Sequence, residues 1–199
     1  MMARSHLLLA GAAYAALALH PIETPLGTLS APALHGLHVP YAGASLDGPP
    51  ALALSTAVAA LSGLGPDIDK SGSAIARSVG LVTRVTAWAA QRTLGHRGPL
   101  HSAWGTLLAF VAGALLGEAL GVSGLGQVVA FGWAVHLLTD AWTSRGVPLF
   151  WPLTPTRLRL PPGFATGSIG EALVLLAGLL ACIWWAGTSP APVRALAVA

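Results

Sequence analysis

The sequence predicts an all-α fold class: a polytopic integral membrane bundle of about five transmembrane helices plus one interfacial amphipathic helix. The first observation is composition, because 54% of the 199 residues are hydrophobic and 9% are charged, against roughly 25% charged residues in a soluble domain. The second is the division of the chain into five apolar runs separated by segments rich in proline and glycine. The third is seven tryptophans, several near the ends of these runs, since indole rings favour the membrane–water interface. Each crossing takes about 20 residues, so the chain has room for a single membrane-embedded domain, residues 1–199.

The first span is expected at residues 7–19, because the proline that follows His20 disfavours further helix. This run is short and follows Arg4, so a secretory signal peptide is the alternative interpretation. Residues 21–50 are rich in proline, glycine, serine and threonine and predict an irregular insert. The other four spans are expected at residues 51–65, 103–120, 127–139 and 169–187.

Residues 73–94 differ from the apolar runs because they carry regularly spaced arginines. Arg77, Arg84 and Arg92 fall within about 80° of one another on a helix, with apolar residues between them. The pattern predicts an amphipathic helix on the membrane surface, its basic stripe facing anionic headgroups. A soluble connector helix has the same pattern and stays open as the alternative. Residues 141–168, which contain five prolines, predict a loop.

Basic residues are distributed unevenly between the two sides of the membrane. With five spans and the N-terminus inside, only Arg194 of the ten Lys and Arg residues falls outside. This asymmetry is what the positive-inside rule expects, and cleavage of the first run would reverse it. We therefore expect a multi-pass protein of the cell (inner) membrane with a cytoplasmic N-terminus. No run of basic residues indicates nucleic-acid binding. The nine inside residues are Arg4, Lys70, Arg77, Arg84, Arg92, Arg97, Arg145, Arg157 and Arg159.

The same topology places most candidate metal ligands at one end of the bundle. A chain with so few charged groups concentrates histidines and carboxylates at the cytoplasmic ends of its five predicted spans. Ionisable groups at membrane depth are costly, so such residues are functional candidates by default. These candidates are His6, Asp67, Asp69, His96, His101, His136, Asp140 and Glu171.

Their spacing suits a metal ion. His136 and Asp140 are four residues apart and project from one helix face, while Asp67 and Asp69 follow a helix-ending Gly-Pro. Mixed imidazole and carboxylate ligands favour zinc, manganese or iron(II) over calcium. Each motif alone also has a structural interpretation: a hydrogen bond at a helix end, or a helix cap. Their convergence on one face favours the metal site. The single Cys182 lies inside the last run and cannot form an internal disulfide.

These motifs, in this order, resemble the YdjM-like, LexA-regulated membrane-bound metal-dependent hydrolases. The resemblance covers nearly the whole chain and implies a polytopic inner-membrane protein with metal-dependent hydrolase activity, distantly similar to the zinc-dependent phospholipase C and single-strand nuclease superfamily. Two departures are Leu100, where the family usually has threonine, and the long insert at 21–50. The motifs are Ser5-His6, Gly65-Pro66-Asp67-Ile68-Asp69, His96-Arg97-Gly98-Pro99-Leu100-His101-Ser102, His136-Leu137-Leu138-Thr139-Asp140, Gly146-Val147-Pro148, Trp151-Pro152 and Thr166-Gly167-Ser168 before Glu171.

The expected function is therefore hydrolysis of a phosphoester in a lipid or amphipathic substrate at the cytoplasmic membrane face. The expected cofactor is a divalent metal, zinc first and manganese or iron as alternatives, and membrane lipids are the expected partners. Arg97 is the candidate for binding a phosphate oxygen, Glu171 is a further ligand or the general base, and Asp69 completes the catalytic candidates. The rival is a non-enzymatic membrane protein whose His/Asp cluster binds or transports metal or protons. The expected metal ligands are His6, Asp67, Asp69, His96, His101, His136 and Asp140.

Overall fold

The computed structural model describes residues 1–25, 27–34, 48–69 and 99–188. This part of the chain contains five α-helices, two short 3-10 helices and one small β-hairpin, which confirms the predicted all-α class. The elements are α1 (Ala3–Leu19), β1 (Ile22–Thr24), β2 (Gly27–Leu29), α2 (Gly48–Ser62), η1 (Gly65–Asp69), η2 (Pro99–His101), α5 (Ala103–Leu120), α6 (Leu125–Ala141) and α7 (Ile169–Gly187).

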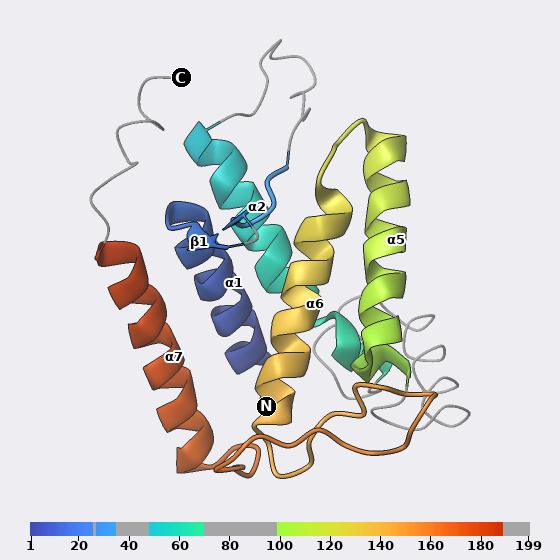
Figure 1. The fold of residues 1–199 in the computed structure, drawn as a ribbon, viewed down its shortest axis with the longest axis vertical. Coiled ribbons are helices and arrows are strands. Elements are labelled where there is room, and N and C mark those ends of the chain that lie inside the picture. Colours follow the sequence, from blue (N-terminus) through green and yellow to red (C-terminus); the bar gives the residue numbers. More distant parts are fainter. Residues whose placement is uncertain (26, 35–47, 70–98, 189–199) are drawn as a thin grey trace.

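Helices α1 and α6 form the centre of the bundle. Helix α1 packs against α2, α6 and α7, whereas α6 packs against α1, α2 and α5 (Figure 1). Helices α5 and α7 thus lie on opposite flanks, and most of their residues are exposed. Glu171 is the only buried residue of α7. A protein with such apolar outer faces needs hydrocarbon around it.

Three segments are long and apolar enough to cross a membrane: Gly48–Asp67, Ala103–Leu120 and Ile169–Gly187. Helix α1 is a shorter apolar helix. The protein is therefore a membrane protein, and five complete crossings remain a prediction for α1 and α6. The predicted amphipathic helix at residues 73–94 lies outside the described residues.

Helix caps fix the ends of α5 and α7 that border the site. The Ser102 side chain accepts a hydrogen bond from the Gly105 backbone N–H, and the Ser168 side chain accepts one from the Glu171 N–H. Each hydroxyl satisfies a helix N–H that has no partner within the helix. The two helices therefore begin at defined residues.

Glycines allow α2 and the two 3-10 helices to approach α6 closely. A Cβ on Gly132 of α6 would lie 2.1 Å from both the Ala59 carbonyl oxygen and the Ser62 hydroxyl of α2. Small residues at helix interfaces permit such contacts in membranes. The Trp133 ring packs directly on Gly65, and its indole N–H donates to the Leu100 carbonyl at 2.8 Å. Trp133 therefore holds η1 and η2 against α6.

The insert at residues 21–50 was expected to be irregular, and this was wrong in two places. Residues 22–29 contain the antiparallel pair β1–β2, with Ile22 opposite Leu29. The β-branched Ile22 and Thr24 favour the extended backbone. Helix α2 begins at Gly48, so Pro49 and Pro50 lie in its first turn, where proline is tolerated because those N–H groups have no helical partner.

Candidate metal centre

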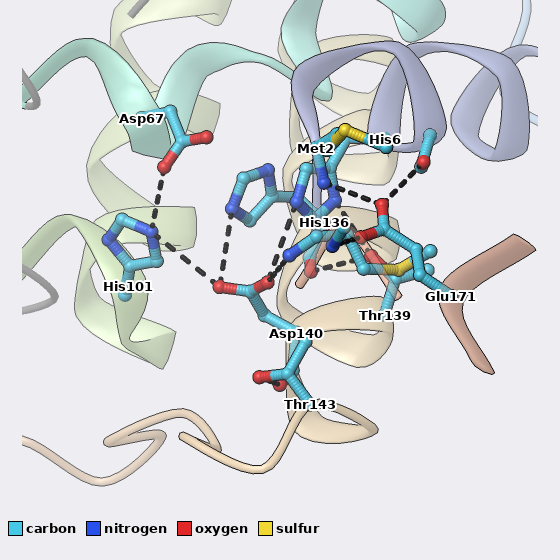
Figure 2. Close-up of polar contacts among 12 residues, drawn as sticks. Met2, His6, Asp67, His101, His136, Thr139, Asp140, Thr143 and Glu171 are labelled. Carbon is cyan, nitrogen blue, oxygen red and sulfur yellow. Dashed lines mark hydrogen bonds and ion pairs between the residues drawn. The ribbon is translucent and has the colours of Figure 1, made fainter. Parts of the chain in front are cut away.

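The candidate site lies at the end of the bundle where α1, α5 and α7 begin and α2 and α6 end (Figure 1). Five of the predicted ligands meet there (Figure 2). They come from four elements, so the cluster forms only when α1, η1, η2 and α6 are packed together. The five are His6 from α1, Asp67 from η1, His101 from η2, and His136 and Asp140 from α6.

The first group is His6, His136 and Asp140, all at most 1% exposed. Nε2 of His6 lies 3.5 Å from Oδ1 of Asp140, and Nε2 of His136 lies 3.9 Å from Oδ2. The two imidazole rings are stacked with their centroids 3.7 Å apart. Both rings therefore direct the same nitrogen toward one buried carboxylate.

The second group is Asp67, His101 and His136. Nε2 of His101 lies 3.5 Å from Oδ1 of Asp67 and 4.0 Å from Oδ2 of Asp140. In each group the ligand atoms lie within 4.8 Å of one another. The groups share His136, whose Nε2 has a single lone pair, so this nitrogen ligates one ion only. Asp140 faces histidines of both groups through its two oxygens, which makes the five residues one continuous cluster.

Hydrogen bonds fix the tautomers of His6 and His136. Nδ1 of His136 lies 2.7 Å from the Gly63 carbonyl oxygen, which only accepts, so this nitrogen carries the proton. The Thr139 hydroxyl donates its one proton to the His136 carbonyl at 2.9 Å. Nδ1 of His6, 2.9 Å from the same hydroxyl oxygen, must then be the donor. Both neutral rings consequently present Nε2 as a bare lone pair.

The donor set fits a divalent transition metal. Among the described residues, Nε2 of His6 and of His136 has no hydrogen-bond partner although each is buried. Two imidazole lone pairs that face one carboxylate favour a cation between them, and the Met1 ammonium group contacts Oδ1 of Asp140 without reaching either Nε2 as a hydrogen-bond donor. Metal–ligand bonds of about 2.0–2.2 Å place the ligand atoms of one ion roughly 3–4 Å apart, which matches the separations at Asp140. Imidazole nitrogens held through their other nitrogen are typical of zinc and iron sites.

Glu171 lies beside this cluster, but its contacts are of another kind. Its Oε1 accepts from the Met2 backbone N–H and the Ser5 hydroxyl, both at 2.6 Å, and Oε2 accepts from the Gly167 N–H at 2.7 Å. The side chain is 1% exposed. It joins the start of α7 to the turn of α1 that carries His6. The Met1 nitrogen makes a further contact, donating to Oδ1 of Asp140 at 2.7 Å.

Other predicted site residues are less fully placed. Asp69 ends η1, two residues after Asp67, and its side chain is outside the description. His96 and Arg97 lie outside the described residues altogether. The sequence interpretation missed Thr139 and the Gly63 carbonyl, which orient the two stacked imidazoles. The sequence shows Thr139 only as a hydroxyl between two predicted ligands of one helix, in His136-Leu137-Leu138-Thr139-Asp140, and does not show which imidazole it contacts.

Comparison with known proteins agrees with this architecture. The uncharacterized protein YvsG of Bacillus subtilis (strain 168) is 34% identical over 132 residues, which cover 66% of this chain and 78% of YvsG. No solved structure matches the chain. The YdjM inner membrane protein family matches residues 1–199, from the first helix through the cluster to the last. The chain thus belongs to the YdjM inner membrane protein family.

Proposed function

We propose that this protein is a membrane-bound, metal-dependent hydrolase that cleaves a phosphoester of a lipid or amphipathic substrate at the cytoplasmic membrane face. The observation that carries the proposal is the pair of buried, tautomer-fixed imidazoles whose Nε2 atoms flank Asp140. A purely structural polar cluster would use those nitrogens for hydrogen bonds. Here they have no hydrogen-bond partner among the described residues, which supports a cation site.

A divalent cation held by these residues would supply Lewis-acid chemistry: it would lower the pKa of a water molecule toward neutral pH and polarise a phosphoryl oxygen. The residues of this chain have separate tasks. His6, His136 and Asp140 would hold the cation, and Asp67 with His101 would extend the cluster toward the partly exposed side, since Asp67 is 17% exposed. Zinc is the proposed metal, with manganese or iron as alternatives.

Three residues proposed from the sequence complete the site. Asp69 and His96 are proposed as further ligands, because both flank described members of the cluster in the chain. Arg97 is proposed to bind a phosphate oxygen, since a guanidinium offers paired donors to phosphate. Seven ligands exceed the four of a single zinc site, so some would bind a second ion or orient the others.

The cytoplasmic orientation is supported by charge. Arg4, Arg145, Arg157 and Arg159 belong to described segments at the cluster's end of the bundle. Positive residues are retained on the cytoplasmic side of membrane proteins. A site at that end would face the inner leaflet and the cytoplasm.

Transport of metal or protons is the rival function. A transport path needs polar groups through the depth of the membrane, and the flanking helices α5 and α7 offer only Glu118 and Glu171 as charged residues, each within a turn of a helix end. The cluster is confined to one end of the bundle, which favours surface chemistry over conduction.

Hydrolysis of a defined substrate panel in mixed micelles tests the proposal. The panel contains phospholipids, isoprenoid phosphates and a soluble phosphodiester, each with zinc, manganese or iron(II). We expect turnover of at least one member that is abolished by His136→Ala and by Asp140→Ala. Thr56→Val is the control, because the Thr56 hydroxyl bonds only the Leu52 carbonyl in α2, away from the cluster. Metal binding without turnover of any member would favour the transport rival.

A further inference from the structure

A cleft on the flank of the bundle suggests how a substrate would be held. Helices α6 and α7 form its walls, and α1, which packs against both, forms its floor. Its volume is about 400 Å³. The lining includes Leu9 of α1, Val135, Thr139 and Trp142 at or near the end of α6, and Val174 and Ala177 of α7.

The cleft offers water almost no hydrogen-bond partner. The Thr139 hydroxyl is engaged by His6 and by the His136 carbonyl, and the Trp142 indole N–H donates to the Pro161 carbonyl at 3.2 Å. The other side chains that line it are apolar or, for Cys182, a half-buried thiol. Ordered water needs two to four polar partners, so the cleft is suited to hydrocarbon. Because the cleft is on the flank of the bundle, beside the candidate span α7, acyl chains of the bilayer would reach it directly.

The cleft also adjoins the metal cluster. Thr139, part of its lining, is the residue that orients His6. One helical turn nearer the start of α1 and α7 is a second cavity of about 300 Å³, lined by residues that include Arg4, Ser5 and Glu171. Arg4 is exposed there and supplies a positive charge. Along this seam the lining thus changes from apolar to polar and charged toward the end of the bundle that carries the cluster. The Glu171 carboxylate of this cavity already accepts hydrogen bonds from the Met2 N–H, the Ser5 hydroxyl and the Gly167 N–H, whereas Arg4 is exposed.

We propose that the cleft between α1, α6 and α7 binds the hydrocarbon chain of a phosphate-bearing membrane lipid, with the phosphate toward Arg4 and the metal cluster. The inference rests on the proposed phosphoester hydrolase and narrows its substrates to lipids of the cytoplasmic leaflet. The polarity of the seam matches that of the ligand: an apolar chain beside Val174 and Ala177, and an anion beside Arg4. A soluble phosphoester would use only the polar end.

Photo-crosslinking tests the binding site without requiring activity. The full chain is placed in phosphatidylcholine nanodiscs containing phosphatidylglycerol with a diazirine in one acyl chain, and adducts are mapped by mass spectrometry. We expect adducts on the cleft residues, and a yield reduced about ten-fold by Ala177→Trp, which fills the cleft. Leu176→Trp is the matched control, because Leu176 is 53% exposed and does not line the cleft, and the substitution adds the same ring. Adducts unaffected by Ala177→Trp, or spread evenly over the outward faces of α5 and α7, would show ordinary annular lipid and overturn the proposal.

The single cysteine provides a second, reversible test through activity. Cys182 lines the cleft, so a hexadecylthio group attached to it by a disulfide would occupy the chain site. We expect lipid phosphoester hydrolysis to fall about ten-fold and to recover on reduction, and a methylthio adduct to lower it far less. The reagent control is Cys182→Ser, whose own rate, whatever its level, should be the same with and without the hexadecylthio reagent. Hydrolysis of a soluble phosphodiester should not change. Equal lipid hydrolysis with and without the long chain would overturn the cleft proposal. Absence of turnover on both substrates would overturn the proposed hydrolase and leave the cleft to be decided by crosslinking.

Discussion

Thr139 shows how a single hydroxyl determines the chemistry of this cluster. It donates to the His136 carbonyl and therefore accepts from Nδ1 of His6. This leaves Nε2 of His6 without a proton and 3.5 Å from Asp140. The Gly63 carbonyl accepts from Nδ1 of His136 and so leaves Nε2 of His136 without a proton as well. Hydrogen-bond partners of this kind orient metal-ligating histidines and raise their basicity.

Removing the hydroxyl should therefore weaken metal binding. We expect Thr139→Val to lower metal affinity about 10- to 100-fold, because His6 loses the acceptor that fixes its tautomer. Thr139→Ser keeps the hydroxyl and should restore affinity. The measurement is competition with a chromophoric chelator in detergent. Wild-type affinity in Thr139→Val would show that the hydroxyl does not orient a ligand.

Arg97 should separate metal binding from catalysis. In Arg97→Ala, metal content should stay at the wild-type level while hydrolysis falls, because the guanidinium is proposed to contact substrate phosphate rather than the ion. Metal analysis and turnover are measured on the same preparation. Loss of metal together with activity would give Arg97 a structural role instead.

At the scale of elements, Glu171 joins α7 to α1. Its three hydrogen bonds to Met2, Ser5 and Gly167 hold the turn that carries His6. No other residue of α7 is buried, so this contact is the main polar link between α7 and the site among the described residues. These contacts therefore favour a positioning role for Glu171. The sequence led us to expect a further metal ligand or the general base.

Two substitutions distinguish these roles. Glu171→Ala leaves three donors without an acceptor, each costing about 1–3 kcal/mol, so the thermal midpoint and the metal affinity should both fall. Glu171→Gln retains one acceptor oxygen. It should recover part of the thermal midpoint and part of the metal affinity, and it should show measurable hydrolysis. Full stability and full metal content with no hydrolysis in Glu171→Gln would instead identify Glu171 as the general base.

Much of the site could be predicted from the sequence, for a physical reason. In a chain with 9% charged residues, histidines and carboxylates at helix ends are conspicuous, and the predicted topology places them on one face. Thr139 and the Gly63 carbonyl could not be found this way, because their roles depend on which ring faces which helix. The start of α2 at Gly48 was missed because paired prolines indicate a loop unless they lie in the first helical turn.

The proposed function requires that the end of the bundle that carries the cluster faces the cytoplasm. Cysteine labelling on a Cys182→Ser background tests it, with Ser45→Cys in the insert and the exposed Ser144→Cys in the 141–168 loop. We expect Ser144→Cys to react only from the cytoplasmic side and Ser45→Cys only from the opposite side, as the distribution of basic residues requires. The reverse pattern would place the cluster on the outer face and refute a cytoplasmic active site.

Metal analysis of the detergent-purified chain, prepared without chelator, tests the central claim most directly. We predict bound zinc, manganese or iron at one or more equivalents, lost in His136→Ala and Asp140→Ala and retained in Thr56→Val. Because an ion that binds only the folded state stabilises it by about 2.7 kcal/mol at 100 times its dissociation constant, a chelator should lower the thermal midpoint of the wild type. The chelator should not lower the thermal midpoint of His136→Ala. A wild-type protein that contains no metal, and takes up none when zinc, manganese or iron is added, would contradict the account.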